Sequence, residues 1–208
     1  MDILQLATLG PVIPVIVIDR IEDAVPMAEA LLAGGIRVLE ITLRTKVALS
    51  SIEVIARELP EAIIGAGTLR SLNDVQAAKN AGCQFGVSPG YSSVLGEFAR
   101  KIALPLLPGV ATSTEIMQAN ADGYYFLKLF PAVAVGGISL LKGFAGPFPD
   151  VKFCPTGGIT VDSAPQFLAL PNVLVCGGTW LTPSDAVVNG DWTRISQLAK
   201  QASALRAN

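Results

Sequence analysis

The segment VLEITLRTKVALSSIEVIARELPEAIIG, residues 38–65, contains one full unit of alternating structure. It begins with an apolar run at 38–42 and continues into residues 47–59, whose apolar side chains recur largely at helical spacing. Pro60 follows, and a proline ends a helix because it has no N–H to donate. A second apolar run then starts at 62. The segment therefore predicts a strand, a helix and a second strand.

Similar apolar runs recur along the whole chain. The eight runs are 15–19, 38–42, 62–65, 85–87, 104–107, 124–128, 151–154 and 173–176. Their centres run from 17 to 174, a mean step of (174−17)/7, or about 22 residues, which is close to what one strand–helix unit requires. Most runs do not alternate with polar residues, as is typical of strands buried on both faces.

Helical patterns fit between these runs. They cover 24–33, 47–59, 71–81 (capped by Ser71 or Asn73), 113–121 (with the capping-type Ser113 at its start) and 191–205. The alternation predicts an α/β fold: a single (β/α)8 TIM barrel that spans residues 1–208 as one domain, with a short N-terminal helix at 2–9. A doubly wound open sheet is the alternative architecture.

The composition excludes several classes of function. The chain has 208 residues, 51% of them hydrophobic, 15 Lys plus Arg, 17 Asp plus Glu, and no histidine. Without histidine there is no Ser-His-Asp or Cys-His catalysis and no imidazole metal ligand. The net charge of −2 argues against a nucleic-acid partner. No cluster of Asp and Glu falls at the predicted strand ends, so we expect no metal site.

The start of the chain and the cysteines indicate where the protein works. Residues 1–18 are apolar but lack a basic leader, and Pro11 and Pro14 interrupt them, so we expect neither a signal peptide nor a membrane span. The three cysteines are far apart and form no Cys-x-x-Cys pair. Reduced thiols of this kind are typical of a cytoplasmic protein, which is the location we predict. The apolar excess also favours a subunit interface.

Two charged residues stand inside apolar runs, where charge is unfavourable unless it is paired or functional. Glu40 would suit proton transfer, or it could form an ion pair with Arg44 at the strand end. Lys128 lies between Leu127 and Leu129, and desolvation favours the neutral amine that attacks a ketone. The alternative is a lysine that extends from the strand end into solvent. Lys152, the only other lysine in a predicted strand, sits at the opposite end of its strand.

Two glycine turns follow the last two predicted strands. They are Thr156-Gly157-Gly158 and Gly177-Gly178-Thr179. Glycines let backbone N–H groups approach an anion, and these loops form the usual phosphate site of a (β/α)8 barrel. Either turn alone could simply reverse the chain, but together they indicate a phosphorylated ligand. Thr68, after the third run, could bind a carboxylate or cap a helix.

The motifs as a set resemble one family. They are Pro-Val-Ile-Pro-Val (11–15), Leu-Glu-Ile-Thr-Leu-Arg-Thr (39–45), Gly-Ala-Gly-Thr (65–68), Ser-Pro-Gly (88–90), Leu-Pro-Gly-Val (107–110), Lys-Leu-Phe-Pro-Ala (128–132), Cys-Pro-Thr-Gly-Gly-Ile (154–159) and Gly-Gly-Thr-Trp-Leu (177–181). In this order, over nearly the whole chain, they resemble the 2-keto-3-deoxy-6-phosphogluconate (KDPG) aldolases, some of which also cleave 4-hydroxy-2-oxoglutarate.

The resemblance implies a metal-free and cofactor-free class I aldolase that works as a homotrimer on a phosphorylated 2-keto acid. It implies that Lys128 forms the Schiff base and Glu40 transfers protons, while Arg44 and Thr68 hold the pyruvate carboxylate. The residues near the reacting carbons would be Phe130, Thr156 and Pro89. Those around the phosphate would be Gly157, Gly158, Gly178 and Thr179. Many members carry serine where Thr179 stands, so the fine substrate preference stays open.

Four other functions compete with this interpretation. A sibling aldolase would act on the galactonate epimer or on unphosphorylated substrate, and a metal-dependent pyruvate aldolase would need a divalent ion. A phosphosugar isomerase or epimerase is disfavoured by Lys128 and by the absence of histidine. A phosphate-binding protein would bind without turnover.

Overall fold

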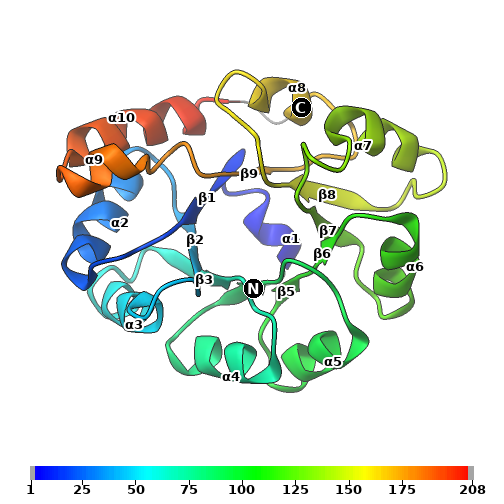
Figure 1. Cartoon of the computed structure of the whole chain (residues 1–208), viewed down its shortest axis with the longest axis horizontal. Coiled ribbons are helices and arrows are strands. Elements are labelled where there is room, and N and C mark those ends of the chain that lie inside the picture. Colours follow the sequence, from blue (N-terminus) through cyan, green and yellow to red (C-terminus); the bar gives the residue numbers. More distant parts are fainter. Residues whose placement is uncertain (1–2, 206–208) are drawn as a thin grey trace.

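The structure is a computed structural model that describes residues 3–205, with the strands inside and all helices after the first one around them (Figure 1). The strands are β1 (Val12–Ile16), β2 (Val38–Thr42), β3 (Ile63–Gly67), β4 (Phe85–Val87), β5 (Leu106–Leu107), β6 (Gly109–Val110), β7 (Phe126–Leu129), β8 (Lys152–Pro155) and β9 (Cys176–Gly178). The helices are α1 (Ile3–Leu6), α2 (Ala24–Ala33), α3 (Ala48–Glu58), α4 (Leu72–Asn80), α5 (Ser93–Lys101), α6 (Ser113–Ala121), α7 (Gly137–Ala145), α8 (Ala164–Leu168), α9 (Ser184–Val188) and α10 (Trp192–Ser203), with a 3-10 turn at Ile21–Asp23.

The strands form two parallel sheets, so the prediction of one closed eight-stranded TIM barrel is wrong. A six-stranded half-barrel sheet has the order β5-β4-β3-β2-β1-β9, and a separate three-stranded sheet has the order β6-β7-β8. Between β8 and the segment that includes β9 there are only two isolated bridges, Phe153 with Val173 and Thr156 with Gly177. At the other junction the chain passes from β5 to β6 through Pro108.

Proline explains why the ladder stops at both junctions. Pro108 separates β5 from β6, and Pro155 ends β8 beside β9. Neither residue has an N–H to donate to a neighbouring strand. The apolar runs show where strands lie, but they cannot show where one hydrogen-bonded sheet ends and the next begins.

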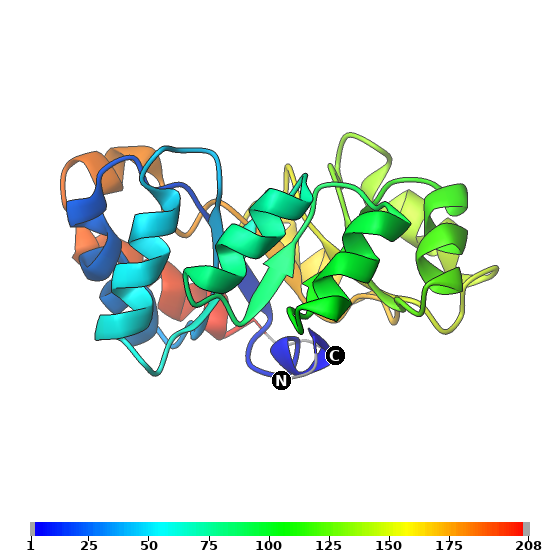
Figure 2. The ribbon, with the colours of Figure 1, turned by 90° about the horizontal axis from the view of Figure 1, so that it is seen from below.

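Apolar side chains fill the space on both sides of the strands. Between the strands lies one cluster, formed by Leu6, Ile13, Val38, Ile63, Phe85, Val87, Leu107, Phe126, Cys154 and Val175. Two larger clusters lie between the strands and the surrounding helices. Figure 2 shows α1 below the strands, where Leu6 covers one end of the inner cluster. The inner cluster closes that end, which leaves the carboxyl ends of the strands for polar residues.

Most predicted elements occur, with shifted ends. The first strand is β1 at Val12–Ile16 instead of 15–19, with Pro14 inside it, and the last is β9 at Cys176–Gly178 instead of 173–176. Of the two predicted caps of α4, the structure has Ser71, in a capping box with Asp74. The cap of α6 is Thr112 rather than Ser113.

Two further findings concern the termini and the membrane. The N-terminal helix is α1 at Ile3–Leu6, shorter than predicted, and Asp2 of the prediction lies outside the described residues. In residues 3–205, no helix has the length and apolar character that a membrane span requires.

Candidate active site

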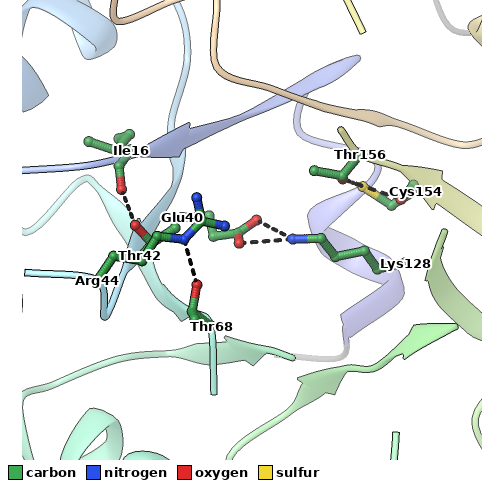
Figure 3. Close-up of polar contacts among 8 residues, drawn as sticks. All are labelled: Ile16, Glu40, Thr42, Arg44, Thr68, Lys128, Cys154 and Thr156. Atoms are coloured by element: carbon green, nitrogen blue, oxygen red, sulfur yellow. Dashed lines mark hydrogen bonds and ion pairs between the residues drawn. The ribbon is translucent and has the colours of Figure 1, made fainter. Parts of the chain in front are cut away.

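A buried ion pair lies at the carboxyl ends of the strands. Lys128 of β7 and Glu40 of β2 are only 4% and 3% exposed. Lys128 Nζ lies 3.1 Å from Glu40 Oε1 and 3.5 Å from Oε2 (Figure 3). Glu40 pairs with this lysine and not with Arg44, and Lys128 does not extend into solvent. Two charges buried in this way stabilise each other only while both are present.

The two partners come from different sheets. Glu40 belongs to the six-stranded sheet and Lys128 to the three-stranded sheet. Both face inward because alternate residues of a strand point to opposite faces, and Val38 and Phe126, two positions earlier, lie in the inner cluster. The Thr42 hydroxyl donates to the Ile16 carbonyl at 2.9 Å, which fastens the end of β2 to β1 beside Glu40.

Arg44 and Thr68 meet at the rim of the same region. The Arg44 Nε donates to the Thr68 hydroxyl at 3.1 Å, and the two residues follow neighbouring strands β2 and β3 (Figure 3). Thr68 has a φ of 65°, a left-handed conformation that a β-branched residue rarely adopts. Such strain often accompanies a functional position. Here the strained residue is the one whose hydroxyl accepts from Arg44.

A cavity of about 160 Å³ opens beside Lys128. It is lined by Val15, Arg44, Lys128, Phe130, Thr156, Gly157, Gly158, Ile159, Gly177, Gly178 and Thr179. Eight of these are residues that the sequence singled out, from segments more than 130 residues apart. Glu40 and Thr68 are bonded to two of the lining residues, Glu40 to Lys128 and Thr68 to Arg44.

The glycine turns present unused donors to this cavity. Within the described chain, the backbone N–H groups of Gly157, Gly158 and Thr179 donate no hydrogen bond to a protein acceptor. Gly157 and Gly158 have φ values of 103° and 78°, which other residues rarely adopt. Three free N–H groups around one small space are suited to an anion such as phosphate.

Phe130 and Thr156 form the side walls next to the amine. Lys128 Nζ lies 5.3 Å from the centre of the Phe130 ring, within the range of a cation–π contact. The Thr156 hydroxyl lies 3.4 Å from the Cys154 carbonyl, to which it donates, and 3.8 Å from Cys154 Sγ. Burial raises the pKa of the Cys154 thiol to about 12, so this residue is no competing nucleophile near neutral pH.

One predicted residue lies elsewhere, and three lining residues were not predicted. Pro89 lines a neighbouring cavity with Arg70 and Tyr91, not the cavity beside Lys128. Val15, Ile159 and Gly177 line the main cavity without having been selected. Gly177 belongs to the quoted Gly177-Gly178 turn, and Val15 and Ile159 end the quoted motifs at 11–15 and 154–159, but none of the three was selected as a site residue.

The arrangement favours chemistry by an amine. A buried lysine with a carboxylate at hydrogen-bond distance can lose its proton to that carboxylate and attack a carbonyl. Arg44 and the free N–H groups offer two separate places for anionic groups of one ligand. Over residues 3–205, no group of three or more His, Cys, Asp or Glu residues could hold a metal ion. Lys152 Nζ donates instead to the Pro171 carbonyl at 3.0 Å, at the other end of β8.

The chain was compared with known proteins. Residues 3–198 match the family model described as KDPG and KHG aldolase. A 2-dehydro-3-deoxy-phosphogluconate aldolase from Pseudoalteromonas atlantica is 51% identical over 195 residues, which cover 94% of this chain and 91% of that protein.

Two solved structures are also similar to this chain. The KDPG aldolase of Zymomonas mobilis, solved with 3-phosphoglycerate, has a TM-score of 0.93 and 46% identity, over 99% of this chain and 96% of that chain. The KDPG aldolase of Legionella pneumophila, with pyruvate captured as a covalent carbinolamine intermediate, has a TM-score of 0.94 and 46% identity, over 96% and 97%.

Proposed function

This chain belongs to the KDPG and KHG aldolase family, and from that premise we propose which of its residues cleave the substrate and how. The protein is a carbon–carbon lyase, a class I aldolase that converts 2-keto-3-deoxy-6-phosphogluconate into pyruvate and glyceraldehyde 3-phosphate. The observation that carries the assignment of residues is the buried Lys128–Glu40 pair at 3.1 Å, beside a cavity with free N–H donors.

The first stage of the proposed mechanism makes the Schiff base. Lys128 Nζ passes a proton to Glu40, which lies within hydrogen-bond distance, and the neutral amine attacks C2 of the keto acid. The carbinolamine that forms loses water, with Glu40 returning the proton to the departing hydroxyl. The iminium keeps the positive charge next to the carboxylate, so the site stays close to electrically balanced.

The second stage breaks the carbon–carbon bond. A base, Glu40 directly or through a water molecule, removes the proton of the C4 hydroxyl. The C3–C4 electrons move into the iminium, which becomes an enamine, and glyceraldehyde 3-phosphate departs. The enamine then takes a proton at C3, and water hydrolyses the resulting iminium to pyruvate and free Lys128. The iminium is the electron sink, so the proposed reaction uses no metal and no cofactor.

The remaining residues orient the substrate in this proposal. Arg44, with Thr68, holds the carboxylate next to C2, and Gly157, Gly158, Gly178 and Thr179 receive the phosphate. Phe130 and Thr156 flank the reacting carbons. The free N–H groups and the φ values of the glycine turn support the phosphate assignment. Pro89 is proposed only as an outer neighbour of the reacting carbons, from its place after β4.

We also propose a homotrimer of single-domain subunits in the cytoplasm, with neither membrane nor nucleic acid as partner. The exposed side chains of Val17, Val133 and Val188 favour a subunit contact, because they add apolar surface at the carboxyl ends of the strands. Sedimentation equilibrium measures the subunit number, and a monomer in solution would contradict this part.

The experiment is reductive trapping with pyruvate. Borohydride should reduce the iminium and leave a stable mass increase on the peptide that contains Lys128. The matched control is Lys152→Ala, which should trap as the unchanged protein does. No adduct, or an adduct on Lys152, contradicts the assignment. Values of kcat/KM for the gluconate substrate, its galactonate epimer and 4-hydroxy-2-oxoglutarate then rank the substrates.

A further inference from the structure

Gly67, the last residue of β3, faces the side chain of Glu40. A Cβ atom built on Gly67 would lie 2.8 Å from Glu40 Cγ and 2.9 Å from Cδ, and closer still to Oε1. Real Cβ atoms essentially never come within 3.0 Å of another heavy atom. The carboxylate of Glu40 therefore occupies the space that any other residue at position 67 would fill.

The backbone does not explain this glycine. Gly67 is not among the residues with positive φ, so an alanine could adopt its conformation. Gly67 pairs in register with Thr42 of β2, and strand pairing at this position does not require a glycine. The requirement for glycine at this position is one of space, and the atoms that set it belong to Glu40.

Glu40 cannot move away without losing its partner. The side chain is buried and its carboxylate lies against Lys128 Nζ (Figure 3). A shift of about 1 Å away from Lys128 Nζ to relieve a contact with a new methyl group would lengthen the 3.1 Å bond beyond hydrogen-bond distance. Misplacement of a reacting group by this amount lowers rates by about 10²-fold.

We propose that Gly67 is a positioning residue: its missing side chain gives the Glu40 carboxylate the place from which it exchanges protons with Lys128. The proposal rests on the proposed function of Glu40. Gly65, two residues earlier, shows the contrast. The three atoms nearest to a Cβ built there all belong to the ring of Phe85, which is part of the inner apolar cluster. Gly65 thus leaves room for the packing of Phe85, and Gly67 leaves room for the Glu40 carboxylate.

A double-mutant cycle tests the proposal. The variants are Gly67→Ala, Glu40→Ala and the two combined. We expect each single change to lower kcat for cleavage by about 10²-fold, in the range of one lost proton-transfer group. The combined variant should match Glu40→Ala, because truncating Glu40 removes Cγ, Cδ and Oε1 and leaves room for the new methyl group. Gly143→Ala, where nothing lies within 4 Å, should keep the original rate.

Two further measurements separate positioning from general damage. The exchange of pyruvate methyl protons with deuterated water reports Schiff-base formation and proton transfer at C3 without cleavage of the C3–C4 bond, and it should fall in Gly67→Ala as far as cleavage does. The pH profile of kcat for Gly67→Ala should resemble that of Glu40→Ala. Thermal unfolding of each variant shows whether it is folded.

Each outcome decides the proposal. A Gly67→Ala enzyme within about threefold of the original kcat overturns it, since that is far from the loss of one general acid or base. The proposal is also overturned if Gly67→Ala lowers kcat by the same factor in the original enzyme and in Glu40→Ala. If Gly67→Ala alone does not fold, a folded double variant with the Glu40→Ala rate supports the proposal, and an unfolded double variant beside a folded Glu40→Ala overturns it. Full activity of Glu40→Ala would instead contradict the proposed function of Glu40.

Discussion

A cavity with lysine and arginine among its lining residues lies at each end of the strands. The two cavities differ in volume and in the hydrogen bonding of their polar groups. The one at the amino ends, lined by Lys79, Arg100 and Tyr124 among others, measures about 690 Å³. The one beside Lys128 measures about 160 Å³. In the larger cavity, Lys79 Nζ donates to the Ala103 carbonyl at 3.0 Å, and Arg100 donates to the Asp122 carbonyl at 2.9 Å.

The polar groups of the two cavities differ in whether the protein already uses them. Ala103 and Asp122 follow the carboxyl ends of α5 and α6, where helices carry partial negative charge, so both cations already have a structural use. In the smaller cavity the amine is buried against a carboxylate, and three N–H groups have no protein acceptor among the described residues. These three N–H groups are available to bind a ligand.

The largest expected effect comes from the two lysines. Lys128→Ala removes the proposed nucleophile and should lower the cleavage rate by at least about 10⁴-fold. Lys79→Ala removes only a surface hydrogen bond in the larger cavity, and it should leave the rate unchanged and lower the free energy of unfolding by no more than about 1 kcal/mol. Pyruvate release in a coupled assay measures both rates. Equal losses from the two variants would abolish the distinction between the cavities.

The two arginines give the second effect. Arg44→Ala should raise the KM of the keto acid by about 10- to 100-fold, because a charge-assisted hydrogen bond contributes about 1.5–3 kcal/mol. Arg100→Ala should leave KM unchanged. Initial rates over a series of substrate concentrations check both. A larger KM for Arg100→Ala than for Arg44→Ala would move the carboxylate site to the other end of the strands.

A third prediction concerns two buried thiols, one near each cavity. Burial raises the pKa of Cys83, beside the larger cavity, to about 12, and that of Cys154 likewise. The folded state keeps these protons when the unfolded chain has lost them. Stability is therefore complete below pH 9 and declines as pH rises toward 12, by about 1.4 kcal/mol per pH unit for each thiol.

Urea unfolding at a series of alkaline pH values measures that decline. Cys83→Ala should make the free energy of unfolding decline less steeply with pH, by the contribution of one thiol. Cys154→Ala should reduce the decline by the same amount. An unchanged slope in both variants would show that other groups cause the alkaline loss.

The sequence marked the two residues of the buried pair more reliably than it predicted the architecture. Glu40 and Lys128 stood out because charge in an apolar strand is rare, and the structure brings them together across 88 residues of sequence. The glycine turns were found because they repeat after neighbouring strands. Val15 and Ile159 lie in quoted motifs but were not selected as site residues, since an apolar residue that lines a cavity looks like any core residue.

The closed barrel was predicted wrongly for a definite reason. Hydrophobic spacing reports the number and direction of strands, but sheet boundaries depend on single hydrogen bonds. Pro108 and Pro155 were visible in the sequence, and only their placement at the two junctions showed what they interrupt. Gly67 was likewise visible in Gly-Ala-Gly-Thr, but the pattern does not say which side chain occupies its space.

The division into two sheets has a consequence for how the enzyme responds to remote change. Glu40 and Lys128 are anchored in separate sheets, so the distance between them gauges how those sheets are aligned. The two sheets meet near Pro108 and Pro155, and few hydrogen bonds join them there. We therefore expect a substitution at either junction, with no contact to substrate, to change the distance between the Glu40 carboxylate and the Lys128 amine.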